Sequence, residues 1–182
     1  MRLYLARHGQ TDWNAQHRVQ GITDIPLNKI GVVQAEELRN KVRKIDFDAC
    51  YASPLIRAQK TAEIATEGKY RILLDDRLRE RGFGKLEGKV CEDWAGIAGG
   101  IDIFDRKLNF AGMGIEPVNT MQARAEDFLD DLRKKYPLDA KVLVVAHAGL
   151  LRDLHFAIVG YDDDTDFATF KIDNAELKEY CI

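Results

Sequence analysis

Residues 3–9 read LYLARHG, and residues 141–149 read KVLVVAHAG. In each stretch a short apolar run stops at a histidine that is followed within two residues by a glycine. Short apolar runs that end at polar loops are typical of strands buried on both faces of a parallel sheet. The two stretches therefore predict two buried strands, each with a histidine at its carboxyl end.

Helical and strand patterns alternate around these two runs. Residues 9–29 are polar and contain Gly21 and Pro26, so we expect a loop there. Apolar spacing and start signals, among them Ser53 before Pro54, predict helices over 29–44, 54–66, 120–136 and 150–159, and strands over 50–52, 71–74, 167–172 and 177–182. The last two strands should form an antiparallel pair. Such alternation predicts an α/β fold, a three-layer α/β/α sandwich with a mainly parallel central sheet.

Length and composition limit the classes of protein that this chain can be. The 182 residues suit one domain, and a formal net charge of -3 argues against general nucleic-acid binding. The longest clean apolar run, 142–146, is far shorter than the ~18 residues of a membrane span, and the first residues lack the apolar stretch of a signal peptide. Three scattered cysteines suggest free thiols. We therefore expect a cytoplasmic protein with no membrane partner.

Residues 88–116 interrupt the alternating pattern. They contain six of the fourteen glycines, together with Trp94, Phe104, Phe110 and Met113. Glycine-rich segments with apolar side chains are found both in lids over active sites and in plain surface excursions. A lid insertion at 88–116 and a surface excursion are both consistent with this composition.

Basic and imidazole side chains gather where the predicted strands end. Arg7 and His8 follow the first strand, Arg57 lies just after the end of the second, and His147 follows the valine-rich strand. Ligands of such sheets bind beyond the carboxyl ends of the strands, so these side chains should face one rim. Guanidinium groups clustered with imidazoles repel one another unless an anion lies between them, and a phosphoryl group fits that requirement.

Residues 7–14, RHGQTDWN, closely resemble the signature of the histidine phosphatase superfamily, in its phosphoglycerate mutase-like branch of small phosphatases. Four further blocks resemble family motifs in the same order: the segment after the signature (Arg18, Gln20, Gly21, Asp24, Pro26, Leu27, Gly31), the second-arginine motif (Ser53, Pro54, Leu55, Arg57, Ala58, Thr61, Ala62), the acid motif (Leu78, Glu80, Phe83, Gly84, Glu87, Gly88) and the second-histidine motif (145–149). Together they span residues 2–152. The resemblance implies a phosphoglycerate mutase-like fold in a single domain, 1–182.

The resemblance also implies roles for the residues at the rim. His8 would be the nucleophile that forms a phosphohistidine, with its other ring nitrogen donating to a backbone carbonyl of the loop. Arg7 and Arg57 would bind the phosphoryl oxygens, and His147 would donate a further hydrogen bond. All four would then act on one phosphoryl group.

Glu80 aligns with the family's proton donor, whereas Glu87 aligns with a structural position. One carboxyl group can protonate the leaving oxygen and later accept a proton from water. Arg77, Arg79 and Arg81 flank Glu80 and would make it a poor acid if they pointed at it, so we expect them to point elsewhere.

Four further residues are implied in substrate binding. Asn14 either donates to the phosphate or caps a local turn. Gln20 and Gly21 belong to the segment after the signature, and Ala148 would offer its N–H to the phosphoryl group. The family usually has glycine at the position of Ala148, a difference that matters if the backbone there needs a positive φ.

The sequence favours a phosphatase that acts on a small phosphorylated metabolite, with neither metal nor cofactor. His17 and His155 lack partners at metal-ligand spacing, and no phosphate-binding glycine loop or dinucleotide fingerprint is present. A phosphoglycerate mutase is the alternative, although Phe83 stands where mutases usually have tyrosine and the insertion has few cations, Lys89, Arg106 and Lys107. A phosphate-binding module without catalysis is a further alternative, which the full set of His8, Arg7, Arg57, Glu80 and His147 disfavours.

Overall fold

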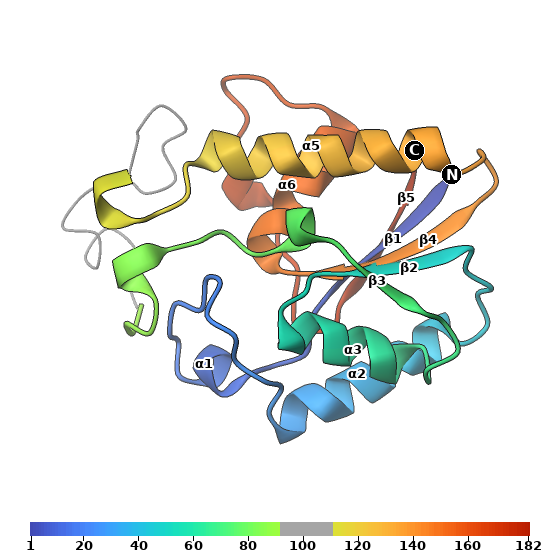
Figure 1. Ribbon diagram of the computed structural model, residues 1–182, viewed down its shortest axis with the longest axis horizontal. Coiled ribbons are helices and arrows are strands. Elements are labelled where there is room, and N and C mark those ends of the chain that lie inside the picture. The colour runs from blue at the N-terminus through green and yellow to red at the C-terminus, as the bar shows by residue number, and fades with distance from the viewer. Residues whose placement is uncertain (92–110) are drawn as a thin grey trace.

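The computed structural model describes residues 1–91 and 111–182, and its centre is a five-stranded sheet (Figure 1). The strand order is β3-β2-β4-β1-β5, with β1 at Arg2–Arg7, β2 at Ala49–Ala52, β3 at Ile72–Leu74, β4 at Lys141–Ala146 and β5 at Leu177–Cys181. The pairs among β3, β2, β4 and β1 are parallel, and β5 is antiparallel to β1. The predicted α/β class and the mainly parallel sheet are confirmed.

Helices cover both faces of this sheet. The α-helices in the described residues are α1 (Asp12–Ala15), α2 (Lys29–Val42), α3 (Ile56–Ala65), α5 (Val118–Lys135) and α6 (Ala148–Val159). Figure 1 shows α5 and α6 on one side of the sheet and α2 and α3 on the other. This arrangement gives the three layers that the sequence predicts.

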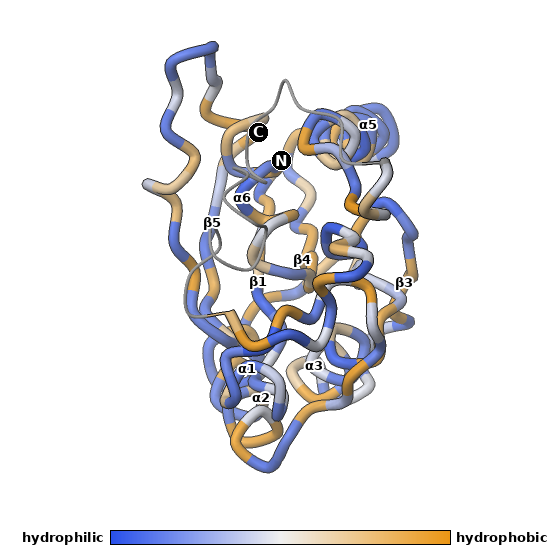
Figure 2. Tube along the Cα trace, turned by 90° about the vertical axis from the view of Figure 1, so that its left-hand side faces the viewer, coloured by the Kyte–Doolittle hydropathy of each residue, from blue (hydrophilic) through white to orange (hydrophobic). Residues whose placement is uncertain are grey.

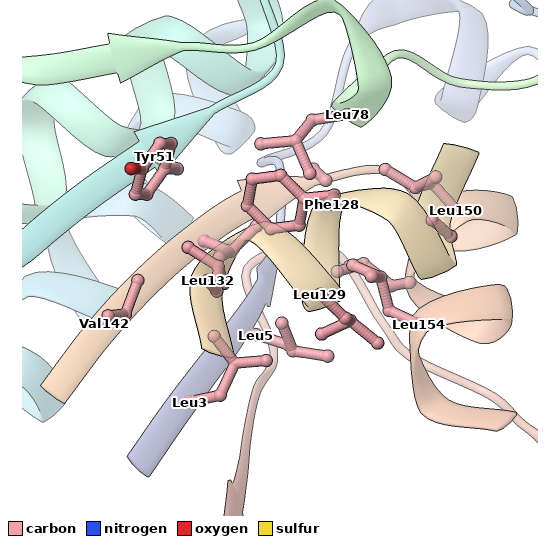
Figure 3. Close-up of a cluster of buried hydrophobic side chains, with 14 of the residues drawn as sticks. Leu3, Leu5, Tyr51, Leu78, Phe128, Leu129, Leu132, Val142, Leu150 and Leu154 are labelled. Carbon is pink, nitrogen blue, oxygen red and sulfur yellow. The ribbon is translucent and has the colours of Figure 1, made fainter. Parts of the chain in front are cut away.

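The alternation of side chains along the strands builds two cores. On β1, Leu3 and Leu5 face α5 and α6, where they join Phe128 and Leu129 in the larger cluster (Figure 3). Tyr4 and Ala6 face the opposite way, toward the cluster that contains residues of α2 and α3. A strand buried on both faces reads as a continuous apolar run, which is why β1 and β4 are easy to find in the sequence.

The amphipathic pattern of α5 matches its position at the surface. Figure 2 looks nearly along α5 and shows hydrophilic residues on its outer side and hydrophobic residues toward the sheet. Met121, Ala125, Phe128 and Leu132, all buried, repeat at intervals of three or four residues on the inner face. Among the described residues, no helix is both long enough and apolar enough to cross a bilayer. All three cysteines lie in the described ranges and are free thiols.

The prediction that 167–172 and 177–182 form an antiparallel pair of strands is wrong. Within 167–172, residues Phe167–Thr169 form a 3₁₀ turn, which begins where the Asp166 side chain accepts a hydrogen bond from the Ala168 N–H. The other strand exists as β5, but it pairs with β1, with Leu3 opposite Tyr180. The apolar content of 167–172 indicated burial correctly for Ile172, but an Asp at a turn start outweighs strand propensity.

The start of α3 also differs from the prediction. Ser53 and Pro54 precede the helix instead of beginning it, and the N-cap residue is Leu55. The Ser53 N–H donates to Val145 O at 3.0 Å and so extends the pairing between β2 and β4. The carboxylate of Asp24, from a distant loop, accepts the Ile56 N–H at 2.7 Å and supplies the missing cap.

The predicted loop 9–29 contains the short helix α1. Thr11 and Asn14 form a capping box, in which each side chain bonds to the backbone N–H of the other. This turn fixes the path of the chain directly after Arg7 and His8.

Candidate active site

The carboxyl ends of the parallel strands β1, β2 and β4 lie together at one end of the sheet. The His8 N–H donates to Ala146 O at 3.0 Å, so the first residue after β1 lies beside the end of β4. The ring centroids of His8 and His147 are 5.1 Å apart. The expected meeting of these two histidines at one rim is therefore observed.

A pocket of about 290 Å³ opens at this rim. Eight of the nine residues expected to catalyse or bind substrate line its wall: Arg7, His8, Asn14, Gln20, Gly21, Arg57, Glu80 and Ala148. His147 is the ninth and is not among the lining residues. The pocket also has apolar walls, formed by Val19, Phe83, Met121 and Phe170.

His8 is buried, with 3% of its surface exposed, and its ring has a defined tautomer. Its Nδ1 lies 2.6 Å from the carbonyl oxygen of Gly9. A carbonyl can only accept, so Nδ1 carries the proton and Nε2 keeps its lone pair. Burial, reinforced by the positive charges of Arg57 and Arg7, lowers the pKa of His8 well below 6.5. The imidazole is therefore neutral at pH 7, as the sequence analysis requires of a nucleophile.

Arg57 is buried at the back of the pocket and joins three segments of the chain. Its guanidinium donates from Nη1 to Thr23 O at 2.8 Å, from Nη2 to Gly21 O at 2.7 Å and from Nε to His147 Nδ1 at 3.2 Å. Burial lowers its pKa to about 10, which still leaves it charged at pH 7. A guanidinium has five N–H donors, so two remain for an anion in the pocket.

Arg7 lines the pocket at the end of β1. Its Nη1 donates to Ile172 O at 2.9 Å, which fixes the side chain against the C-terminal segment. Its Nε is buried and has no hydrogen-bond partner among the described residues. A buried donor without an acceptor costs free energy, and a hydrogen bond to an anion in the pocket would remove that cost. Burial of the guanidinium also lowers the pKa of Arg7.

His147 lies behind Arg57 and is fully buried. Because its Nδ1 accepts from Arg57, its Nε2 carries the proton and donates to Ser53 Oγ at 2.8 Å. Burial and the nearby charge of Arg57 lower its pKa well below 6.5. In this structure the donor expected for the phosphoryl group is thus directed to Ser53.

Glu80 reaches the pocket from the loop that follows β3. Its Oε1 accepts the Arg81 N–H at 2.9 Å, and its Oε2 accepts the Gly149 N–H at 3.2 Å. These backbone donors hold the carboxyl group at the amino end of α6.

The side chains of the flanking arginines bind acceptors other than the Glu80 carboxyl. Arg77 donates to the carboxylates of Asp75, Asp127 and Asp131, Arg79 donates to Asp76, and Arg81 donates to the carbonyl oxygen of Glu116. The sequence could not show this, because the acceptors on Asp127 and Asp131 lie some fifty residues away.

Glu87 has the contacts of a structural residue. Its carboxylate accepts the N–H groups of Phe83 at 2.9 Å, Ile22 at 3.2 Å and Thr23 at 3.0 Å, and it also bonds to the Thr23 hydroxyl. It therefore joins the loop that carries Gly21 to the loop that carries Glu80.

The polar residues of the first loop both line the pocket and hold α1. The Asn14 side-chain oxygen accepts from the Thr11 N–H and lies 3.1 Å from the Thr11 hydroxyl. The same hydroxyl donates to Gln20 Oε1 at 2.9 Å. Both alternatives for Asn14 are thus compatible, because it caps a turn and also faces the pocket.

Ala148 begins α6 with an ordinary helical backbone. It is absent from the non-glycine residues with positive φ, which are His17, Glu67 and Ala175. Its replacement of the usual glycine therefore causes no backbone strain. The amino end of a helix carries partial positive charge, so Ala148 and Gly149 add to the positive potential of the pocket.

Arg18 and Arg152 also line the pocket, and the sequence predicts no role in the site for either. Arg81, one of the three arginines that flank Glu80, lines it as well. Arg18 belongs to the segment after the signature, and Arg152 lies on α6 one turn beyond the second-histidine motif. Spacing along α6 could have placed Arg152 near the face of Ala148, since the two are four residues apart. Within 1–91 and 111–182, no group of three or more His, Cys, Asp or Glu could hold a metal ion.

The structure describes only the two ends of the proposed lid insertion at 88–116. Residues 92–110, with Trp94, Phe104 and Phe110, lie outside the described residues. Met113, at the end of the insertion, packs against the small cluster formed by Val19, Phe83, Leu86 and Ile115.

Comparison with known proteins points to one family. The family described as histidine phosphatase superfamily (branch 1) matches residues 3–182. An uncharacterized phosphatase, PhoE, of Bacillus subtilis is 35% identical over 88% of this chain and 78% of its own. A 2,3-bisphosphoglycerate-dependent phosphoglycerate mutase of Methylobacterium is 31% identical over 90% of this chain and 83% of its own. A solved mycobacterial glucosyl-3-phosphoglycerate phosphatase with VO3 is similar in fold, with a TM-score of 0.86, 28% identity and coverage of 98% and 91%.

Proposed function

The chain belongs to the histidine phosphatase superfamily and is an enzyme of its phosphatase or mutase-like kind, and from this premise we propose that it hydrolyses small phosphomonoesters, without a metal, through a phosphohistidine on His8. The domain that does so would extend over 1–182. The observation that carries the proposal is the state of His8, a neutral imidazole whose Nδ1–H is bonded to Gly9 O and whose pocket also contains Arg7 and Arg57.

In the first step, Nε2 of His8 attacks the phosphorus atom. The N–P bond forms as the bond from phosphorus to the ester oxygen breaks, and the Glu80 carboxyl gives its proton to the departing oxygen. Arg7 and Arg57 bind the phosphoryl oxygens, over which the negative charge of the transition state is spread. Fixed cations in a pocket shielded from water stabilise that charge without reorganising.

In the second step, water attacks the phosphohistidine. The Glu80 carboxylate, now deprotonated, accepts a proton from this water, the N–P bond breaks, and inorganic phosphate leaves neutral His8 behind. The pocket as described opens to solvent at the rim and would admit that water. Gln20, Gly21, Asn14 and Ala148 line the same wall and are the proposed substrate contacts. His147 would act through Arg57, because its Nδ1 accepts a hydrogen bond from the Arg57 Nε–H.

The test of this proposal is the hydrolysis of p-nitrophenyl phosphate by wild type and by His8→Asn, with EDTA present. Asparagine fits the site but cannot form a phosphohistidine, so we expect turnover to fall by at least about a thousandfold. His155→Asn is the matched control, because His155 lies on α6, bonds to the Tyr180 hydroxyl and is not among the pocket residues. It should retain wild-type turnover.

Trapping supports or overturns the intermediate directly. Brief incubation with labelled substrate, followed by a quench in alkaline denaturant, should leave labelled phosphate on wild type and none on His8→Asn. The label on wild type should survive in base and be released by acid. Equal turnover by wild type and His8→Asn would overturn the role of His8, and loss of activity in EDTA would overturn the metal-free mechanism. Exchange between 3- and 2-phosphoglycerate that is faster than phosphate release would show a mutase instead.

A further inference from the structure

Glu80 lies in a stretch of chain without regular structure. After β3 and the 3₁₀ turn Asp76–Leu78, residues 79–83 form neither helix nor strand. Backbone carbonyl groups in such a stretch have no partners in a helix or a sheet, so other groups must satisfy them. A group that transfers a proton needs a fixed position. The position of Glu80 therefore depends on contacts from elsewhere in the chain.

Arg124, on α5, binds three carbonyl oxygens of this stretch. Its Nη1 donates to Arg77 O and to Arg79 O, both at 2.6 Å, and its Nη2 donates to Glu80 O at 3.2 Å. Its Nε and Nη2 also donate to the two carboxylate oxygens of Glu116, at 2.8 and 3.0 Å. A guanidinium has five N–H donors, so each donor of Arg124 has an acceptor.

Glu116 binds the same loop from its other end. Its Oε2 accepts the Gly82 N–H at 3.2 Å, and its own N–H donates to Gly82 O at 2.8 Å. Its carbonyl oxygen accepts from Arg81 Nε at 2.7 Å. The side chains of Arg124 and Glu116 are only 18% and 20% exposed, so water screens this ion pair weakly. One ion pair thus holds the loop 77–82 on both sides of Glu80.

Two helices hold the two parts of Glu80. Arg124 on α5 binds its backbone carbonyl, whereas the Gly149 N–H at the amino end of α6 donates to its Oε2 at 3.2 Å. The two helices pack against each other, and their side chains share the core cluster shown in Figure 3. The place of the carboxyl group in the pocket therefore depends on the contacts that α5 makes with the loop.

We propose that Arg124, with Glu116 as its partner, is the positioning residue of the proton donor, and that it holds the backbone at Glu80 so that the carboxyl group faces the ester oxygen. Neither side chain is among the described residues that line the pocket, so both would act through Glu80 and not on the substrate. The Glu116 carboxylate offsets the charge of Arg124, so the arrangement adds no unpaired cation behind the proton donor. This inference rests on the proposed function, which gives Glu80 its role in proton transfer.

The test measures kcat/KM for two esters whose leaving groups differ in their need for a proton. Glycerol 3-phosphate releases an alkoxide that must be protonated, whereas p-nitrophenyl phosphate releases a stable phenolate. We expect Arg124→Gln to lower kcat/KM about ten- to a hundredfold for glycerol 3-phosphate and by less than about threefold for p-nitrophenyl phosphate. Arg124→Lys keeps the charge but cannot bind three carbonyl groups and a carboxylate together, so its loss should be intermediate.

A second substitution, at the proton donor itself, shows whether Arg124 acts through it. In Glu80→Gln the carboxyl group is gone, so a residue that only positions this group has no further effect on the rate. Adding Arg124→Gln should then change the rate on glycerol 3-phosphate by less than about twofold, measured in single turnovers with enzyme in excess. Arg133→Gln is the matched control, because Arg133 also lies on α5 and is paired with Asp130. It should leave both esters at wild-type values.

Melting temperatures show which variants are folded. If Arg124→Gln fails to fold because Glu116 loses its partner, two other variants provide the test. Arg124→Lys keeps the ion pair, and the combined replacement of Arg124→Gln with Glu116→Gln leaves no unpaired charge. Each should show the larger loss on glycerol 3-phosphate.

The failure of this inference differs from the failure of the proposed function. Wild-type rates in the Arg124 variants, equal losses on both esters, or an undiminished loss in the Glu80→Gln background would each overturn the positioning role while hydrolysis through His8 stands. If wild type hydrolyses neither ester, or if Glu80→Gln keeps wild-type kcat/KM for glycerol 3-phosphate, the proposed function fails instead.

Discussion

Replacing Gly149 by alanine should displace Glu80 while leaving the fold intact. A Cβ atom at position 149 would lie 2.5 Å from Glu80 Oε1, whereas ordinary contacts begin near 3.4 Å. The carboxyl group would therefore have to move by roughly 1 Å. Glu80 is a flexible side chain, so the clash is relieved by this movement instead of by the backbone.

The size of the effect follows from the role proposed for Glu80. A misplacement of about 1 Å in a catalytic group can cost on the order of a hundredfold in rate. Gly149 is the second residue of α6 and has an ordinary helical backbone, and alanine is the better helix former by up to about 1 kcal/mol. We therefore expect kcat/KM for an alkyl phosphate to fall roughly ten- to a hundredfold, with no decrease in melting temperature.

A comparison of two leaving groups shows whether Gly149→Ala impairs proton donation. An alkoxide needs a proton as it leaves, whereas p-nitrophenolate leaves well without one. The loss in kcat/KM should thus be larger for glycerol 3-phosphate than for p-nitrophenyl phosphate. Gly112→Ala serves as the control, because a Cβ there meets nothing within 4 Å. Full activity of Gly149→Ala on the alkyl ester, or equal losses on both esters, would refute the reasoning.

Three further predictions concern charge and burial. The imidazole of His8 should titrate well below 6.5, because burial, Arg57 and Arg7 disfavour its cation, and the neutral ring should carry its proton on Nδ1. Nitrogen NMR of the free enzyme measures the titration midpoint and the tautomer. A midpoint at or above 6.5 contradicts the prediction. Asp153 is buried with its pKa raised from 3.8 to about 7, so the folded state holds a proton that the unfolded chain loses, and folding stability falls by about 1.4 kcal/mol per pH unit as pH rises through that interval. Asp153→Asn removes this dependence, and its melting temperature relative to wild type should be higher at pH 8 than at pH 5; a constant difference would show that Asp153 titrates normally. Arg57→Lys should lower kcat/KM by about a hundredfold and also lower the melting temperature, since an ammonium cannot reach Thr23 O, Gly21 O and His147 Nδ1 together; wild-type values in both assays would contradict the bridging role.

The sequence predicts the parts of this fold that depend on local pattern. β1 and β4 are continuous apolar runs because both of their faces are covered, and α5 has a clear stripe because one face meets the sheet. Local pattern does not predict structure that depends on contacts between residues far apart in the sequence. The hydroxyl of Ser53 bonds to His147 instead of capping α3, and Asp24 supplies the cap from a loop about thirty residues away. β5 pairs with β1, and residues 167–172 do not pair with β5 as the sequence predicts.

In the candidate site, too, the sequence predicts some features and not others. Residue types at strand ends were enough to bring Arg7, His8 and Arg57 into one pocket, because topology alone fixes where parallel strands end. The direction of each hydrogen bond was not predictable from spacing. His147 lies where its motif suggests, yet its Nε2 bonds to Ser53. Arg77, which flanks Glu80, binds Asp127 and Asp131 on α5, and no local pattern connects it to these acids.

Arg57 shows why substrate binding and the shape of the site are linked in this protein. Its guanidinium is bonded to the carbonyl oxygens of Gly21 and Thr23, and Glu87 holds the same loop from the other side through Ile22 and Thr23. The loop that lines the pocket is thus held by the cation that would bind the phosphoryl group. Burial lowers the pKa values of His8 and His147, and the charge of Arg57 lowers both further. One buried cation therefore orders the wall, adds to the lowering of the His8 pKa and, in the proposed function, binds the phosphoryl group, so a change at Arg57 should alter all three together.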